Sequence, residues 1–141
     1  MKKVMAMGTF DVLHAGHLAY LAQAKRQGDR LIVVIARDAT VEQERGRKPL
    51  HDERERLRAV QRVELVDEAV LGNVGDKLAI VRQLKPDAIC LGYDQAADEH
   101  ALRRALREWD LGQVRILRMS AFQPERYKSS ILKKRMMKEG L

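Results

Sequence analysis

The chain has 141 residues, of which 45% are hydrophobic, so it is of single-domain size and can bury one sizeable core. Its net charge of +7 makes nucleic acid a partner to consider, but aromatic residues form 4% of the chain, which leaves few platforms for stacking bases. The longest apolar run, Leu31 to Ala36, is far shorter than the roughly 20 residues of a membrane-spanning helix. We therefore expect one soluble, cytoplasmic domain over residues 1–141 that does not enter a membrane.

Apolar and amphipathic segments alternate along the chain, without repeats or low-complexity linkers. Short apolar runs predict strands, and apolar residues that recur every three to four positions predict helices. In chain order we expect a strand over Val4–Met7, a helix over His14–Gln27, a strand over Leu31–Ala36, a long polar loop over Arg37–His51, a helix over Asp52–Val63, a strand over Val66–Leu71, a helix over Lys77–Leu84, a strand over Asp87–Leu91, a helix over Glu99–Trp109, a strand over Val114–Met119 and a basic helix from about Ser129.

Particular apolar positions in these elements are predicted to form the core. The segment Leu31–Ala36 is continuously apolar, as in a strand that is covered on both faces. Cys90 is the single cysteine, which excludes an internal disulfide, and its apolar neighbours indicate a buried thiol. Gly28 is expected to stop the helix that precedes it. The predicted helical core positions are Leu18, Leu21, Ala22, Leu57, Val60, Leu102, Leu106 and Trp109.

Strands that are joined by helices at this spacing predict an α/β fold with a doubly wound, mostly parallel, Rossmann-like sheet. The carboxyl ends of parallel strands face one crevice, which is where such sheets bind ligands. The pair Gly8-Thr9, the loop from Arg37, the turn Gly92–Gln95 and the segment after Met119 all follow predicted strands. We therefore expect these four segments to converge on one site.

The segment Met7–His17 places two histidines three residues apart, on one face of the first turn of a helix. Thr9 and Phe10 offer backbone N–H groups at the strand end, Gly16 lets an anion approach the backbone, and the helix N-terminus adds free donors and a positive dipole end. This pattern favours a phosphate pocket. The alternatives are capping or core histidines, or a metal pair, for which His51 and His100 supply no supporting cluster.

The run GTFD-x-x-HxGH resembles the signature of the cytidylyltransferase-like nucleotidyltransferases. The resemblance implies that His14 and His17 hold the phosphates of a nucleoside triphosphate while an acceptor attacks its α-phosphorus. It also implies nucleotide binding by residues around the turn, namely Thr9, Phe10, Ala15 and Gly16, with Asp11 as a further candidate.

The segments Ala36–Val41 and Gly46–Pro49 look like the loop in which this family places a phosphate-gripping lysine, a role that the resemblance gives to Lys48. A solvated, charged loop is the alternative. Arg56 matches the family's helix arginine, although a surface role is also compatible with its position.

Two later segments also match the family's pattern. The turn Leu91–Gln95 resembles an LGxD element, in which Gly92 allows a tight exit from the strand and Asp94 would contact a ribose hydroxyl; a helix cap is the alternative for Asp94. The segment from Tyr127 stands where the family has a serine- and threonine-rich helix start. Ser129 and Ser130 would there grip the β- and γ-phosphates or act as an N-cap, and Lys128 replaces a common hydroxyl.

In-line attack on the α-phosphorus requires mainly positioning and neutralisation of charge, with pyrophosphate as the leaving group. The sequence shows no Walker loop, no Ser-His-Asp elbow and no pair of carboxylates placed on one element for acid-base catalysis. We expect magnesium to bridge the phosphates, with no dedicated protein metal site. The basic segments 45–48 and 126–138 would supply the positive field that the phosphates need.

Within the superfamily, the order GTFDVLHAGH, ARDATVE, GRKP, VDEAVLG and LGYDQ is most like the archaeal-type FAD synthases. The resemblance therefore implies transfer of AMP from ATP to FMN. The glycerol-3-phosphate cytidylyltransferases, which use CTP, share fewer of these elements and are the alternative, with a basic nucleic-acid-binding module as the non-enzymatic one. Small members of this family often pair, so a homodimer is possible.

Overall fold

The computed structural model describes residues 1–74, 78–92 and 99–119. Strands and helices alternate along this part of the chain, as the sequence predicts. In chain order the elements are β1 (Lys3–Gly8), α1 (Ala15–Lys25), β2 (Arg30–Ile35), α2 (Asp38–Arg45), α3 (Glu53–Gln61), β3 (Glu68–Leu71), α4 (Ala79–Leu84), β4 (Ala88–Leu91), α5 (Glu99–Glu108) and β5 (Arg115–Arg118).

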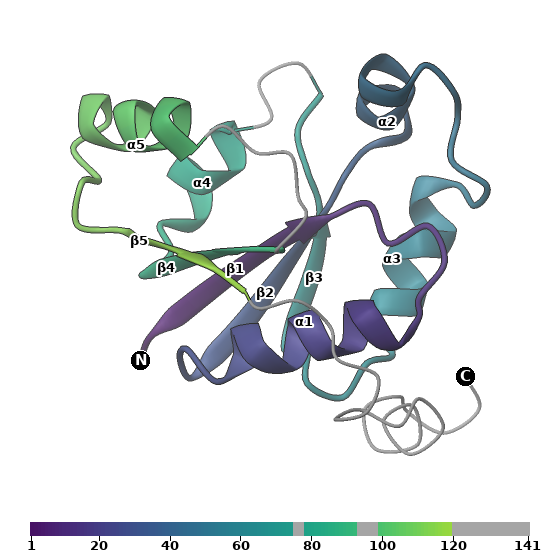
Figure 1. Cartoon of the computed structure of the whole chain (residues 1–141), viewed down its shortest axis with the longest axis horizontal. Coiled ribbons are helices and arrows are strands. Elements are labelled where there is room, and N and C mark those ends of the chain that lie inside the picture. The colour runs from purple at the N-terminus through teal and green to yellow at the C-terminus, as the bar shows by residue number, and fades with distance from the viewer. Residues whose placement is uncertain (75–77, 93–98, 120–141) are drawn as a thin grey trace.

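The described strands form one parallel sheet in the order β3-β2-β1-β4-β5 (Figure 1). The central strand β1 pairs with β2 from Lys3↔Arg30 to Gly8↔Ile35, and with β4 from Val4↔Ala88 to Ala6↔Cys90. This arrangement confirms the predicted α/β, Rossmann-like class. The strand order reverses beside β1, because β2 and β3 lie on one side of it and β4 and β5 lie on the other.

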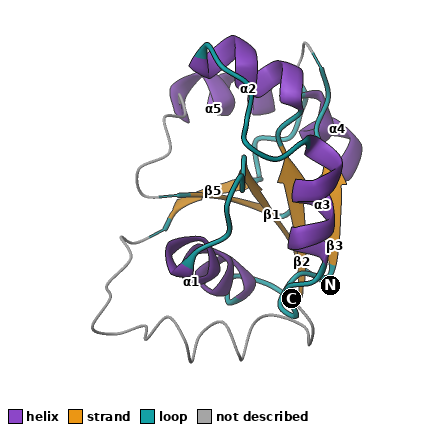
Figure 2. Cartoon of the chain, turned by 90° about the vertical axis from the view of Figure 1, so that its right-hand side faces the viewer, coloured by secondary structure: helices purple, strands orange, loops and turns teal. Residues whose placement is uncertain are grey.

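Helices cover both faces of the sheet, and alternate residues of β1 point into two separate cores. Val4 and Ala6 belong to the core beneath α1 and α3, whereas Met5 belongs to the core beneath α4 and α5. Figure 1 shows α1 below the strands and α4 and α5 above them, and Figure 2 shows α1 and α5 on opposite sides of β5. The predicted helical core positions are buried, except that Leu57 and Trp109 are partly buried against these cores.

The predicted polar loop over Arg37–His51 is wrong in its first half, because residues 38–45 form the helix α2. Its polar composition conceals the helix, of which Val41 is buried. The stop signal was present in the sequence: Gly46 follows the helix with a φ of 75°, a conformation that favours glycine. The predicted basic helix from about Ser129 lies outside the described residues.

Two further expectations concern Gly28 and Cys90. The helix α1 ends at Lys25 with Arg26 as its C-cap, so it stops before Gly28 and not at it. Glycine is needed at position 28 for another reason: a Cβ atom there would lie 2.5 Å from Cγ2 of Val4 in β1. Cys90 is fully buried, as predicted, and burial raises the pKa of its thiol to about 11. None of the helices in the described part of the chain has the length and apolarity needed to cross a bilayer.

Candidate active site at the carboxyl ends of the strands

The crevice of this sheet lies beyond the carboxyl ends of β1 and β4, where the strand order reverses. The chain that leaves β1 forms the turn of residues 9–14 and enters α1, so the HxGH segment stands at this crevice. Helix α2 stands beyond the carboxyl end of β2, and the segment that follows it closes the same end of the sheet (Figure 1). Two of the four predicted segments are thus brought together there.

The turn after β1 depends on an unusual backbone conformation at Phe10, whose φ is 54° although it carries a large side chain. Its ring is buried against Gly8, where a Cβ atom would lie 2.8 Å from Cε2 of the ring. Glycine is therefore required at position 8. In the part of the chain that the structure describes, no acceptor faces the backbone N–H of Thr9 or Phe10. Donation of these two N–H groups to a phosphate, which the sequence predicts, stays a prediction.

The two histidines are fixed by the first turn of α1. Nδ1 of His14 accepts a 3.0 Å hydrogen bond from the N–H of Gly16, and Nδ1 of His17 accepts a 3.3 Å hydrogen bond from the N–H of His14. A neutral imidazole whose Nδ1 accepts must carry its proton on Nε2. The capping arrangement therefore selects the tautomer in which each Nε2 is a donor.

The rings of His14 and His17 stack at 3.9 Å between centroids, and Phe10 lies 5.4 Å from His17. His14 is exposed and His17 is partly buried. The predicted capping role is thus real, and it does not exclude phosphate binding, because capping occupies Nδ1 and leaves the proton on Nε2. Ala15 is buried in the helix, and Gly16 is partly exposed at the first turn.

Asp11 joins this turn to the segment that carries Lys48. Its carboxylate accepts hydrogen bonds from the backbone N–H of Leu50 at 2.7 Å and of His51 at 2.8 Å. Burial alone would raise the pKa of Asp11. These two hydrogen bonds lower it by more than burial raises it, so the net pKa lies below its usual value. The carboxylate therefore stays ionised and ties residues 50–51 to the HxGH turn.

A cavity of about 260 Å³ opens beside this connection, and Lys48 lines it as an exposed residue. Its walls combine three cations with apolar side chains and the Asp11 carboxylate. The lining residues are Asp11, Val41, Arg45, Arg47, Lys48, Pro49 and Leu50. This is a positive pocket directly next to the histidine turn, which suits a phosphorylated substrate.

Arg56 is 1% exposed, so the surface role considered for it is wrong. From α3 its guanidinium donates to the carbonyl oxygens of His51 at 3.0 Å, of Thr9 at 2.8 Å and of Ala36 at 2.8 Å. It also donates to the carboxylate of Asp38 at 2.6 Å. One side chain thus joins the ends of β1 and β2, the start of α2 and the segment before α3.

A second set of contacts, which the sequence reasoning missed, links the starts of α2 and α3. The N–H of Asp38 donates to the carboxylate of Glu53 at 2.9 Å, and the N–H of Glu53 donates to the carboxylate of Asp38 at 3.2 Å. Arg37 pairs with Glu53 at 2.9 Å and donates to the carbonyl oxygen of Gly72 at 2.7 Å. The signal in the sequence is an acidic residue at the start of each of two helices, Asp38 in α2 and Glu53 in α3. It can be used only once residues 38–45 are recognised as a helix.

Gly92 follows β4, and its carbonyl oxygen accepts a 2.6 Å hydrogen bond from Arg118 of β5. The remaining predicted site residues lie outside the described residues; they are Asp94, Tyr127, Ser129 and Ser130.

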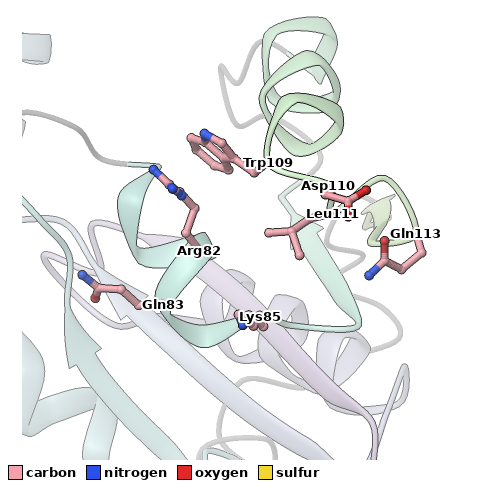
Figure 3. Close-up of a pocket in the computed structure, with 7 residues that line it drawn as sticks. All are labelled: Arg82, Gln83, Lys85, Trp109, Asp110, Leu111 and Gln113. Carbon is pink, nitrogen blue, oxygen red and sulfur yellow. The ribbon is translucent and has the colours of Figure 1, made fainter.

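A larger cavity, of about 600 Å³, lies at the other end of the sheet (Figure 3). Two of its lining residues contact each other: the guanidinium of Arg82 in α4 lies beside the ring of Trp109, which follows α5, with the guanidinium carbon 5.1 Å from the ring centroid. Lys85 and Gln113 also line it, and each precedes the amino end of a strand. Ligands of open α/β sheets bind at the carboxyl ends, so this cavity is not the candidate active site.

A doubly wound sheet with a helix N-terminus at its switch point is the architecture of nucleotide-binding α/β proteins. The cytidylyltransferase-like family matches residues 5–135. The chain belongs to this family and is a nucleotidyltransferase.

The chain is also similar to curated relatives and to solved structures. The chain is 42% identical to the FAD synthase of Thermoplasma volcanium over 97% of its own length and 95% of that protein, and 48% identical to the FAD synthase of Methanothrix thermoacetophila over 88% and 85%. A crystal structure described as a lipopolysaccharide core biosynthesis protein of Thermoplasma volcanium matches with a TM-score of 0.82 at 43% identity, over 87% of this chain and 99% of that one. Pantothenate synthetase of Thermus thermophilus shares the fold, with a TM-score of 0.55 at 18% identity, over 92% of this chain and 60% of that one.

Proposed function

We propose that this protein is an FMN adenylyltransferase, which transfers AMP from ATP to FMN and forms FAD and pyrophosphate. The observation that carries the proposal is the geometry of His14 and His17, whose Nδ1 atoms are occupied by backbone N–H groups at the switch point of the sheet. The curated relatives named FAD synthase, which match most of the chain, support the choice of ATP and FMN.

In the proposed reaction, a phosphate oxygen of FMN attacks the α-phosphorus of ATP in line with the departing pyrophosphate. A bond forms between that oxygen and the α-phosphorus, and the bond between the α-phosphorus and the bridging oxygen of the β-phosphate breaks. Nε2–H of His14 and of His17 would donate to phosphate oxygens on which negative charge increases, as would the backbone N–H groups of Thr9 and Phe10. No protein nucleophile is needed.

Lys48 would hold a phosphate from the segment that Asp11 ties to the turn. The cavity beside it carries Arg45 and Arg47 as well, so its charge is complementary to the phosphate of FMN. Its apolar walls, Val41, Pro49 and Leu50, are compatible with part of the flavin or its ribityl chain. Arg56 would act through the backbone that it holds.

The rest of the site is proposed from the family resemblance. Asp94 would contact a ribose hydroxyl and Gly92 would shape its turn, while Ser129 and Ser130, with Tyr127 beside them, would hold the β- and γ-phosphates. Magnesium would be bound by phosphate oxygens and would neutralise their charge. Among the described residues, no three His, Cys, Asp or Glu side chains converge as metal ligands. We also propose one domain over residues 1–141, a cytoplasmic location and no nucleic-acid partner, with a homodimer as an assembly to test.

The test is a matrix of substrate pairs. Protein and magnesium are incubated with ATP or CTP, each together with FMN or glycerol 3-phosphate, and pyrophosphate release is measured. ATP with FMN should react fastest and yield FAD, identified by mass spectrometry. A faster reaction of CTP with glycerol 3-phosphate would replace the proposal by the cytidylyltransferase alternative. No release from any pair, with salt-sensitive binding of a random oligonucleotide, would favour the nucleic-acid module.

A further inference from the structure

Tyr20 connects the helix of the histidines to the split between two strands. It lies on α1 three residues after His17, therefore on the same side of the helix. Its hydroxyl donates to the carbonyl oxygen of Cys90 in β4 at 2.6 Å and accepts from the N–H of Met7 in β1 at 3.2 Å. The carbonyl oxygen of Met7 is 3.3 Å away, so the single phenolic proton favours Cys90.

The hydroxyl lies where β1 and β4 separate. Pairing between these strands ends at Ala6↔Cys90, whereas β1 continues to pair with β2 as far as Gly8↔Ile35. Met7 is the first residue of β1 beyond the paired stretch on the β4 side, and its N–H is satisfied by Tyr20 instead of a strand. A side chain from α1 thus bridges the two strands at the point where the crevice begins.

The ring of Tyr20 also supports the turn above it. Phe10 stacks on Tyr20 with 6.5 Å between ring centroids and 18° between their planes. Phe10 in turn lies 5.4 Å from His17, and His17 lies 3.9 Å from His14. The four rings form a continuous aromatic row from the strand split to the proposed phosphate-binding histidines.

We propose that Tyr20 is a positioning residue whose hydroxyl sets the separation of β1 and β4 and, through Phe10, the orientation of His17 toward the phosphates. The proposal rests on the proposed role of His17. Burial holds the pKa of Tyr20 far above its usual value, so the hydroxyl keeps its proton and remains a donor at neutral pH. Tyrosine can bridge an N–H and a carbonyl in this way, and phenylalanine of nearly the same shape cannot.

If Tyr20 has a purely structural role, the expected effect of its substitution is different. Removing its hydroxyl would leave a donor and an acceptor of the sheet without their partner and would lower stability, with no specific effect on turnover in the folded enzyme. A positioning residue changes turnover itself, because a displacement of the histidine rings weakens contacts made in the transition state more than binding of the ground state. The two roles are therefore separated by a control that is destabilised elsewhere.

The test compares Tyr20→Phe with Val81→Ala, which creates a cavity under α4 on the other face of the sheet. Both are assayed with ATP and FMN well below their melting temperatures, and long-range ¹H–¹⁵N spectra of the imidazoles report the tautomer and environment of His17. We expect Tyr20→Phe to lower kcat by about ten- to a hundredfold with the KM for ATP within about threefold. We also expect the ring resonances of His17 to move in Tyr20→Phe and to keep their positions in Val81→Ala.

Two results would overturn the positioning role while leaving the proposed function intact: a Tyr20→Phe variant with the kcat of Val81→Ala, or unmoved His17 resonances in Tyr20→Phe. The variant His17→Ala separates a failure of the positioning role of Tyr20 from a failure of the proposed phosphate-binding role of His17. If it retains wild-type turnover of ATP and FMN, the proposed role of His17 fails, and the positioning role of Tyr20 fails with it.

Discussion

The guanidinium of Arg56 donates a 2.8 Å hydrogen bond to the carbonyl oxygen of Thr9, a residue 47 positions earlier in the chain. The same side chain reaches the carbonyl oxygens of Ala36 and His51 and the carboxylate of Asp38. A cation that is 1% exposed would be costly without these acceptors, and together they satisfy it. Arg56 is therefore the point at which the HxGH turn, α2 and the Lys48 segment are held together.

We predict that Arg56→Lys destabilises the fold by about 2 to 4 kcal/mol, because an ammonium group cannot reproduce the planar fork that serves several acceptors at once. Chemical denaturation with circular dichroism measures this loss. Arg58→Lys is the matched control, since Arg58 is exposed on the same helix. An Arg56→Lys variant as stable as Arg58→Lys would show that the buried network contributes little.

His14→Asn tests the separation of capping from phosphate binding. Asparagine is a strong N-cap residue, so the start of α1 should keep its stability, while the donor at Nε2 is lost. We expect a melting temperature within a few degrees of the wild type and turnover of ATP and FMN lower by on the order of a hundredfold. Wild-type turnover in the folded variant would show that His14 only caps α1 and does not bind phosphate.

Lys48→Ala should raise the KM for FMN or lower turnover, since a charge-assisted contact contributes roughly 1.5 to 3 kcal/mol. Lys48→Arg should restore part of the loss, because the two cations differ in shape. Lys2→Ala is the control, as Lys2 is exposed beside the amino end of β1. If all three variants match the wild type in steady-state kinetics, Lys48 is a solvated loop residue.

The sequence was sufficient for the sheet and for the histidine turn, for physical reasons. Continuously apolar segments such as Leu31–Ala36 are characteristic of strands covered on both faces, and the spacing of the helices between them implies parallel crossovers. The motif from Gly8 to His17 combines a strand end, glycines and a helix start in one short segment, so its geometry is local. Local geometry can be predicted from local sequence.

The contacts that hold the site together could not be predicted in this way, because they join segments far apart in the chain. Arg56 and Thr9 are 47 positions apart, and Tyr20 and Cys90 are 70 positions apart. A tyrosine in an apolar helix stripe gives no sign that its hydroxyl will reach a strand split. An arginine in a charged helix is expected to have a solvent-exposed side chain. Most of the acceptors that bury Arg56 are backbone carbonyl oxygens, and backbone atoms leave no signal in the sequence.

The ion pair between Asp67 and Lys25 leads to a prediction about acid stability. Burial alone would raise the pKa of Asp67, but Lys25 at 2.5 Å and the N–H of Leu31 at 2.7 Å more than offset this, so the net pKa falls below 3.8. A carboxylate whose pKa is lowered by folding stabilises the native state above its unfolded pKa, and this contribution is lost as pH falls through the folded value. Asp11, whose pKa is also lowered, acts in the same direction.

We therefore predict that the wild-type melting temperature falls steeply below about pH 4, and that Asp67→Asn reduces the slope of that fall. At pH 7 the variant should melt at a lower temperature than the wild type, because it lacks the charge that faces Lys25, whereas at pH 2 to 3 the two should approach each other. Calorimetry across this range measures both effects, with Glu64→Gln as an exposed control for the change in charge. If the melting temperatures of Asp67→Asn and wild type differ by the same amount at pH 7 and at pH 2.5, the pKa of Asp67 is not lowered in the folded protein.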